Sequence, residues 1–208
     1  MRIIGLSGGI ASGKNFVADI FEKNGAAVFD ADAEVHQIFA KDKKIISQIG
    51  KTFPSAVKSN SIDRKLLGKL VFNNTEKLEI LEKILHPEVR KKYQEFLKAA
   101  KKNHKKITIL NIPLLLEKSQ GDNTYKCDKI ISVIVKKSLQ KRRFLARARK
   151  LNPQNFKAEL KNLEKKFEDI FARQITNSER KTKSDFVINS GISKAETIKQ
   201  VKNIIPQL

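Results

Sequence analysis

The sequence predicts an α/β fold built around a parallel sheet, and two features of the chain carry this prediction. Short runs rich in isoleucine and valine recur along the chain, and helix-length charged segments separate them. The first of these runs also leads directly into a glycine-rich turn and then into a helical pattern. Alternating strands and helices are typical of βαβ units, and continuous apolar strands suit a sheet that is covered on both faces.

The expected elements follow in order along the chain. Residues 2–7 form a first strand, and residues 13–23 carry apolar side chains at helical spacing. A second strand over residues 26–29 ends at Asp30 and is followed by another helical pattern. Further strands are expected at residues 107–112, 129–135 and 186–188.

Residues 42–103 differ from the rest because they contain only helical patterns. We expect helices over residues 65–72 and 75–85, and then a separate helix that Pro87 opens at its first turn. This segment is therefore interpreted as a helical insertion into the α/β domain.

A second charged segment lies between the strands expected at 129–135 and 186–188. A basic stretch over residues 136–150 precedes a helical stretch over residues 155–174, which has an apolar stripe on one face. The stripe fits a flap over a site, and it fits equally well a surface helix that packs on the core. The periodicity does not decide between these two interpretations.

Composition limits the classes of function. The formal net charge of +21 favours phosphate-bearing partners, but the lysines are spread along the chain, as in a solvated surface around a site for an anionic substrate. Cys127 is the single cysteine, and no apolar run is long enough for a signal peptide or a membrane span. We expect a soluble, cytoplasmic protein with no membrane partner and no specific nucleic-acid partner.

The strongest local signal is a glycine-rich motif that lies between the first strand and the first helix. It matches the pattern G-x-x-x-x-G-K, and its residues are Gly8, Gly9, Ile10, Ala11, Ser12, Gly13 and Lys14. Glycines let such a loop curl until its backbone N–H groups face phosphate oxygens, and the helix N-terminus and the lysine add positive charge. The motif predicts binding of a nucleotide such as ATP.

The next residue departs from this pattern. Asn15 occupies the position where a Ser or Thr hydroxyl usually contacts Mg²⁺. An amide oxygen can still contact the ion directly or through water, and Mg²⁺ takes other ligands from substrate phosphates. We expect Asn15 to be a weak Mg²⁺ ligand that lowers metal affinity without abolishing activity.

Other polar residues are candidates for the same site. Asp30 and Asp32 follow the second strand at the edge of the sheet where ligands bind in open α/β folds, so either could orient an attacking hydroxyl or cap a helix. Arg143 and Arg147 share a helical face and could hold phosphates, although a solvated basic face has the same pattern. His86 is interpreted as structural or substrate-positioning, because the histidines show no metal-ligand spacing.

Taken together, several segments resemble the dephospho-CoA kinase family nearly end to end. The matching segments are Gly5–Ile10, Ser12–Lys14, Val28–Asp32, Ile62–Arg64, His86–Val89, Pro113–Glu117, Gln140 with Arg143 and Arg147, Gln174, and Ser184–Gly191. Each is weak alone, but their joint order separates this family from kinases that share only the first loop. The departures are Asn15, Ala11 in place of a usual Gly, and the segment Thr52–Pro54.

The resemblance implies a three-layer P-loop kinase fold with a five-stranded parallel sheet. Its core would comprise residues 1–41, 104–135 and 175–208, with residues 42–103 as a helical domain for the substrate and residues 136–174 as a helical lid. The implied reaction transfers the γ-phosphoryl group of ATP to the ribose 3′-hydroxyl of dephospho-CoA, with Mg²⁺ present. A monomer or a small homo-oligomer is expected.

The resemblance also implies roles for individual residues. Asp32 matches the general base, Lys14 and the loop from Gly9 to Asn15 match the groups that hold the ATP phosphates, and Arg143 acts with Arg147 as the lid closes. Residues matching positions near the acceptor are Arg64, His86, Leu114, Leu115 and Glu117, and Asn189 matches a position near the adenine.

Two alternatives stay open at this point. One is another P-loop kinase that phosphorylates a small molecule or a nucleotide. The other is a basic nucleic-acid-binding protein with a decayed kinase site, for which Asn15 would be the sign of decay.

Overall fold

The computed structural model describes residues 1–58, 61–72, 74–118 and 125–208. Its internal contacts divide the chain into two compact units. We name Met1–Phe29 with Asn103–Leu208 the sheet unit, and Asp30–Lys102 the helical unit.

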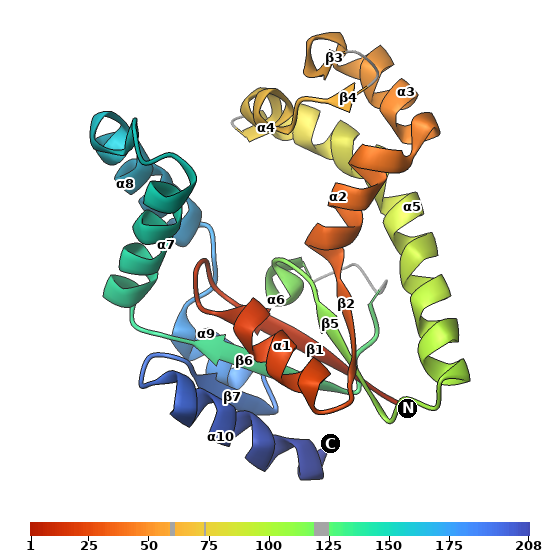
Figure 1. The fold of residues 1–208 in the computed structure, drawn as a ribbon, viewed down its shortest axis with the longest axis vertical. Helices are drawn as coiled ribbons and strands as arrows, with labels where there is room; N and C mark the ends of the chain where they lie inside the picture. Colours follow the sequence, from red (N-terminus) through yellow and green to blue (C-terminus); the bar gives the residue numbers. More distant parts are fainter. Residues whose placement is uncertain (59–60, 73, 119–124) are drawn as a thin grey trace. The chain divides into compact units, whose positions relative to one another are not determined.

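A parallel sheet of five strands runs through the sheet unit in the order β2-β5-β1-β6-β7 (Figure 1). The strands are β1 Arg2–Gly8, β2 Ala27–Asp30, β5 Ile107–Asn111, β6 Lys129–Ile134 and β7 Phe186–Asn189. β1 is central, pairs in parallel with both β5 and β6, and is buried over most of its length. The α/β fold with a five-stranded parallel sheet is confirmed, and each strand lies within two residues of its predicted range.

Two aspartates fix the register of this sheet at the end where the strands begin. Asp128 accepts a hydrogen bond from the backbone N–H of Ile3 at 2.7 Å and donates its own N–H to the Ile3 carbonyl. Asp185 makes the same pair of contacts with Ile130 and binds Lys129 at 2.8 Å. Each aspartate thus pins the start of a strand to its neighbour.

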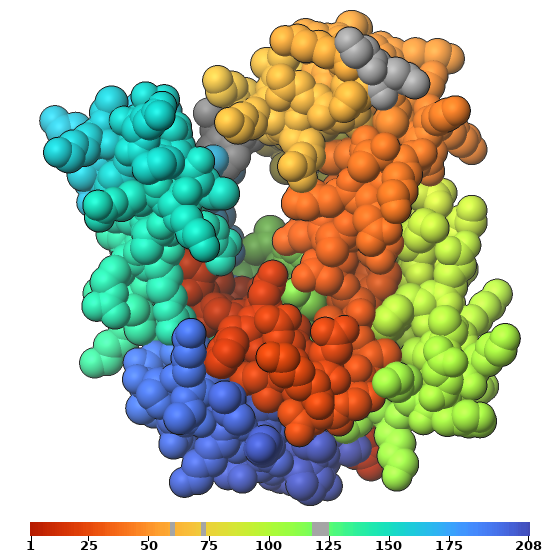
Figure 2. Space-filling view, viewed as in Figure 1, coloured from red at the N-terminus to blue at the C-terminus, as the bar shows by residue number. Residues whose placement is uncertain are grey.

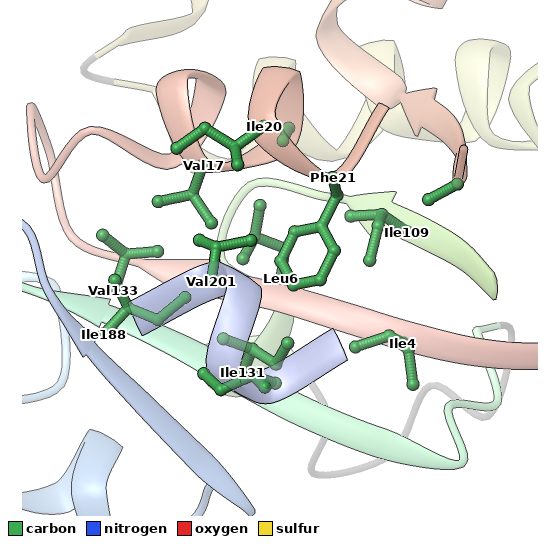
Figure 3. Close-up of a cluster of buried hydrophobic side chains, with 13 residues drawn as sticks. Ile4, Leu6, Val17, Ile20, Phe21, Ile109, Ile131, Val133, Ile188 and Val201 are labelled. Carbon is green, nitrogen blue, oxygen red and sulfur yellow. The ribbon is translucent and has the colours of Figure 1, made fainter. Parts of the chain in front are cut away.

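Helices α1 (Lys14–Lys23) and α10 (Lys194–Ile204) cover one face of the sheet, and the short η2 helix (Ile205–Gln207) ends the chain. Figure 3 shows Val17 and Phe21 of α1 and Val201 of α10 packed on strand residues such as Leu6, and all of these side chains are fully buried. Helices α6 (Leu115–Lys118) and α9 (Asn177–Thr182) pack against β1 and β6 on the other face. These helices and the sheet form three layers.

Helices α7 (Lys137–Leu151) and α8 (Phe156–Ala172) pack on each other as a hairpin. The ring of Phe167 is fully buried and lies 5.7 Å from that of Phe144, and Lys137 and Glu168 form an ion pair at 2.6 Å. In Figure 2 the teal and cyan atoms of this hairpin stand out from the red and blue atoms of α1 and α10. The apolar stripe of α8 therefore includes a residue that packs on α7.

The helical unit contains α2 (Ala31–Lys41), α3 (Lys43–Thr52), η1 (Pro54–Ala56), α4 (Arg64–Phe72) and α5 (Thr75–Lys102). Two expectations for this region are wrong. A short antiparallel pair, β3 (Val57–Lys58) with β4 (Ser61–Ile62), occurs where only helices were expected, because strands of two residues leave no readable pattern. The helix also continues through Pro87 without a break.

Pro87 fails to end α5 because an apolar stripe runs past it. Leu81, Leu85, Val89 and Tyr93 recur every four residues, and all four are buried. Pro87 itself is exposed, so its cost is limited to one lost backbone hydrogen bond and the local clash of its ring.

The boundary of the helical unit also differs from the expected one. Residues 31–41 were expected to belong to the core, but α2 contacts α3, α5 and β4, so it groups with the helical unit.

Among the helices of the described ranges, we find none that is both long and apolar enough to cross a membrane.

Candidate functional site

The glycine-rich loop connects β1 to α1 in a tight turn. Gly13 has φ 96° and Ala11 has φ 53°, so both lie in the left-handed region. Glycine adopts this region without strain, whereas alanine pays for the clash of its Cβ with the backbone, about 1–2 kcal/mol. Ala11 is therefore strained, so the alanine at this position, where the family usually has glycine, destabilises the loop.

The loop leads to a helix N-terminus suited to an anion. Gly13 caps α1 without a side-chain hydrogen bond, and the first turn of α1 contains no acidic residue. The N–H groups of a first helical turn have no acceptor within the helix, and the helix dipole adds positive potential there. Lys14, the first residue of α1, places a full positive charge at the same end.

Arg143 joins the loop to the turn that follows β7. Its Nη1 donates to the carbonyl of Ser12 at 3.2 Å and to Ser190 Oγ at 3.0 Å, and its Nη2 donates to the Ser190 carbonyl at 2.8 Å. The Ser190 hydroxyl also donates to the Ser12 carbonyl. Burial lowers the pKa of Arg143, and the neighbouring charge of Arg142 lowers it further. In this structure Arg143 binds protein oxygens and so holds two loops together.

A cavity of about 500 Å³ lies beside these loops. Its lining includes Gly13, Phe16, Arg143, Arg147, Ser190 and Ile192. The cavity thus combines the phosphate loop, the arginine face of α7 and the turn after β7, all within the sheet unit. Its size suits a ligand of nucleotide dimensions.

Asn189 shapes one wall of this region through its own turn. Its side chain accepts the N–H of Gly191 at 2.9 Å, and its backbone N–H and carbonyl bind the side chain of Gln200. Asn189 therefore fixes the path of residues 190–193, all four of which line the cavity.

A buried ion pair lies at the end of β1. Arg180 is 1% exposed, donates to Ser7 Oγ at 2.7 Å and pairs with Glu117. The second carboxylate oxygen of Glu117 is buried, and no partner for it is found among the described residues. Sequence reasoning missed Arg180, because it lies in a polar run that looks like a solvated surface.

The turn that carries Glu117 contains the other residues expected near the acceptor. Leu114 has φ 55° and is 37% exposed, while Leu115 is buried against β1. Asn111, at the end of β5, donates its side-chain N–H to Asn15 Oδ1 at 3.3 Å. Sequence reasoning also missed Asn111, whose amide orients that of Asn15.

The donor set available for a metal ion is small. No cluster of three or more His, Cys, Asp or Glu side chains that could hold a metal occurs in the part of the chain that the structure describes. Asn15 lies in the first turn of α1 with its amide oxygen directed by Asn111. This set fits Mg²⁺ that takes most of its ligands from phosphates and water.

The remaining candidates belong to the helical unit. Asp30 caps α2 by accepting the N–H of Ala33 at 3.0 Å, so it has the capping role considered for the two aspartates. Asp32 follows in the first turn of α2 and is exposed. Arg64 begins α4 and His86 lies on α5, and both side chains are exposed.

Comparison with known proteins decides the family. The family model for dephospho-CoA kinase matches residues 2–196. The chain belongs to the dephospho-CoA kinase family. The dephospho-CoA kinase of Bartonella quintana is 41% identical over 208 residues, which cover all of this chain and 98% of that protein. That of Wolbachia pipientis wMel is 36% identical over 206 residues, covering 99% of this chain and 97% of that protein.

Solved structures agree with this family. A protein of Thermus thermophilus has a TM-score of 0.79 at 26% identity, covering all of this chain and 97% of the other. The dephospho-CoA kinase of Campylobacter jejuni has a TM-score of 0.59 at 25% identity, covering 99% of this chain and 96% of the other. The family and the fold predicted from the sequence are confirmed, and membership in a kinase family implies that ATP is used.

Proposed function

We propose that this chain catalyses the ATP-dependent phosphorylation of the ribose 3′-hydroxyl of dephospho-CoA, which yields coenzyme A and ADP. The observation that carries the proposal is the glycine loop over residues 8–13. It leads to Lys14 at a helix N-terminus without a side-chain cap, in a chain that the kinase family model matches over residues 2–196. Phosphoryl transfer depends mostly on positioning and on charge neutralisation, and such a loop supplies both.

The sheet unit binds ATP in this proposal. The loop from Gly9 to Asn15 and the ammonium of Lys14 hold the β- and γ-phosphates, and the cavity lined by Arg147 and residues 190–193 receives the rest of the nucleotide. Arg143 supports the loop, and it neutralises phosphate charge once the α7–α8 hairpin closes as a lid. Closure would also exclude the water that could hydrolyse ATP.

Asn15 is the proposed protein ligand for Mg²⁺, acting through its amide oxygen or through water. Bound there, Mg²⁺ would offset the negative charge of the phosphates. The hydrogen bond from Asn111 holds the Asn15 oxygen in one orientation. Less conformational freedom is then lost when this neutral amide binds the ion.

The helical unit supplies the general base in the proposal. Asp32 takes the proton of the 3′-hydroxyl while the new O–P bond forms, and the bond from the γ-phosphorus to the bridging oxygen breaks to release ADP. A carboxylate suits this step because a positioned aspartate can act as a general base. Arg64 and His86, together with Leu114, Leu115 and Glu117 of the sheet unit, are the proposed contacts for dephospho-CoA.

A coupled assay of ADP release tests the proposal. Dephospho-CoA is compared with nucleoside monophosphates at saturating ATP and millimolar Mg²⁺, and the position of the new phosphate is read by NMR. We expect turnover with dephospho-CoA and a phosphate on the ribose 3′-oxygen. Turnover with a monophosphate alone would indicate another kinase, and salt-sensitive binding of nucleic acid without any turnover would indicate the basic nucleic-acid-binding alternative.

A further inference from the structure

Two glutamines that are distant in sequence bind the same residue of the phosphate loop. Gln174, which follows α8, accepts the backbone N–H of Ile10 at 2.8 Å through its Oε1. Gln140, in the first turn of α7, donates its Nε2 to the backbone carbonyl of Ile10 at 2.8 Å. The peptide groups on both sides of Ile10 are therefore held, one as a donor and the other as an acceptor.

The two amides lie directly on the backbone of the loop. Gln140 is only 2% exposed, which is unusual for a glutamine. A Cβ added at Gly9 would lie 2.8 Å from Gln140 Nε2 and 3.2 Å from Gln174 Oε1. A side chain at residue 9 would displace these two amides, so Gly9 has a role that is separate from backbone freedom.

The positions of the glutamines connect the loop to the α7–α8 hairpin. Gln140 lies at the start of α7 and Gln174 two residues beyond the end of α8, so both ends of the hairpin bind Ile10. Within the hairpin, Phe144 packs on Phe167. A movement of either helix at its base must therefore shift Ile10 or break one of the two hydrogen bonds.

We propose that Gln140 and Gln174 are positioning residues that set the shape of the phosphate loop and couple it to the α7–α8 hairpin. They act through Ile10 and do not contact ATP. Because the N–H of Ile10 is bound to Gln174, that N–H is directed away from the phosphates, and the loop binds them through its other amides. This inference rests on the proposed function, because it assigns the loop to ATP.

The chemistry of the two positions predicts an asymmetry. Residue 174 must accept a hydrogen bond, so Gln174→Glu keeps the contact with the N–H of Ile10. Residue 140 must donate, so Gln140→Glu places a carboxylate against the Ile10 carbonyl and loses the contact. Methionine at either position keeps the length of the side chain and removes the amide.

The test uses the full chain with the variants Gln140→Met, Gln174→Met and the double variant. The control is Gln154→Met, in the connection between α7 and α8. It makes the same substitution within the hairpin, but at an exposed glutamine. Binding of ATP with Mg²⁺ is measured by calorimetry, and exchange of the Ile10 amide hydrogen is followed by NMR. Both readouts work without the acceptor, so they stay decisive even if dephospho-CoA is not the substrate.

We expect each single variant to weaken ATP binding about ten-fold, or about 1.4 kcal/mol, because the loss of a buried hydrogen bond leaves a polar backbone group unpaired. The double variant should lose less than the product of the two effects, because both act on one residue. Gln174→Met should speed exchange of the Ile10 amide at least ten-fold, Gln174→Glu should keep it slow, and Gln154→Met should change neither quantity.

Three results would overturn the proposal. The first is ATP affinity in both methionine variants equal to that of the wild type. The second is a loss of affinity fully accounted for by a fall in global stability, as measured by urea unfolding. The third is found in the wild type and holds even if the variants do not fold. An Ile10 amide hydrogen that exchanges as fast as an exposed one would contradict the contact with Gln174.

Discussion

The sheet unit and the helical unit bury different kinds of side chain. In the part of the chain that the structure describes, every buried polar residue belongs to the sheet unit. These residues are Ser7, Ser12, Thr108, Asn111, Ser132, Gln140, Arg180, Ser190 and Thr197. The buried side chains of the helical unit are apolar apart from the hydroxyl of Tyr93, and Asp32, Arg64 and His86 are exposed on its helices.

This difference separates two ways of building a site. Burying a polar group costs free energy unless it is hydrogen-bonded, so polar burial is found where a fixed geometry is needed. Ser12 lies in the phosphate loop, and Gln140 and Ser190 bind its backbone. Backbone strain is also confined to this unit, since the described non-glycine residues with positive φ are Ala11, His104 and Leu114. The loop is thus pre-organised, whereas the helical unit presents its candidate groups from an apolar scaffold.

The largest expected effects separate the two units by function. Lys14→Ala should lower turnover at least about a thousand-fold and weaken ATP binding, because the proposed role of the lysine is to contact the phosphates in both the ground and transition states. Asp32→Ala should lower turnover by a similar factor and leave ATP binding intact. Steady-state kinetics and calorimetry check both variants, and near-native turnover in either one would contradict its proposed role.

The next effect concerns stability and the buried ion pair. Arg180→Met should lower the free energy of unfolding by about 3–5 kcal/mol, because it leaves the carboxylate of Glu117 buried without its partner. His86→Ala, on the exposed face of α5, should change the free energy of unfolding by less than about 0.5 kcal/mol. Adding Glu117→Gln to Arg180→Met should recover part of the loss in urea unfolding, and a fully additive double variant would show that the pair is not coupled.

The thiol of Cys127 reports on burial within the sheet unit. Burial raises its pKa to about 11, and the charge of Asp128 adds to the shift. At pH 8 the thiol should react with iodoacetamide roughly a hundred-fold more slowly than an ordinary thiol, because only the thiolate is nucleophilic. A cysteine introduced by Lys91→Cys in a Cys127→Ser background should react at the ordinary rate, and equal rates for the two would contradict the burial.

The same shift fixes the sign of one pH effect. The folded chain holds the thiol proton more tightly than the unfolded chain does, so this contribution to stability is complete below the unfolded pKa of about 9. It is lost as the pH rises toward 11. Alkaline unfolding of the Cys127→Ser variant should therefore show less dependence on pH in this range.

The smallest effect tests the strain in the loop. Ala11→Gly should raise the free energy of unfolding by about 0.5–1 kcal/mol, since relief of the left-handed strain exceeds the extra entropy of glycine in the unfolded chain. Gly25, with φ 91° and open space around it, is the reverse control, and Gly25→Ala should lower stability by about 1 kcal/mol. A fall in the free energy of unfolding for both substitutions would show that Ala11 is not strained.

Prediction from the sequence succeeded where a local pattern decides the structure. The strands from β1 to β7 in the main sheet carry continuous apolar runs, and the glycine motif over residues 8–14 lies between β1 and α1 as expected. Prediction failed where distant packing decides: α5 passes through Pro87 because its buried stripe continues, and α2 packs with the helical unit. Arg180 could not be found, because nothing in a polar run distinguishes a buried charge from a solvated one.

The candidate site divides in the same way. The motif identified Lys14 and the loop, but the groups that hold the loop in shape come from residues more than a hundred positions away. Gln140 and Gln174 were noticed only as matches to a family, and their contacts with Ile10 needed the structure.

A titration of the wild-type chain and of Lys14→Ala with ATP at millimolar Mg²⁺ is the most direct measurement of how the loop works. A single saturable site in the wild type that is weakened at least about ten-fold in Lys14→Ala is the result expected from a pre-formed phosphate loop. An absence of saturable ATP binding in the folded wild type, or equal affinity in the two proteins, would contradict it.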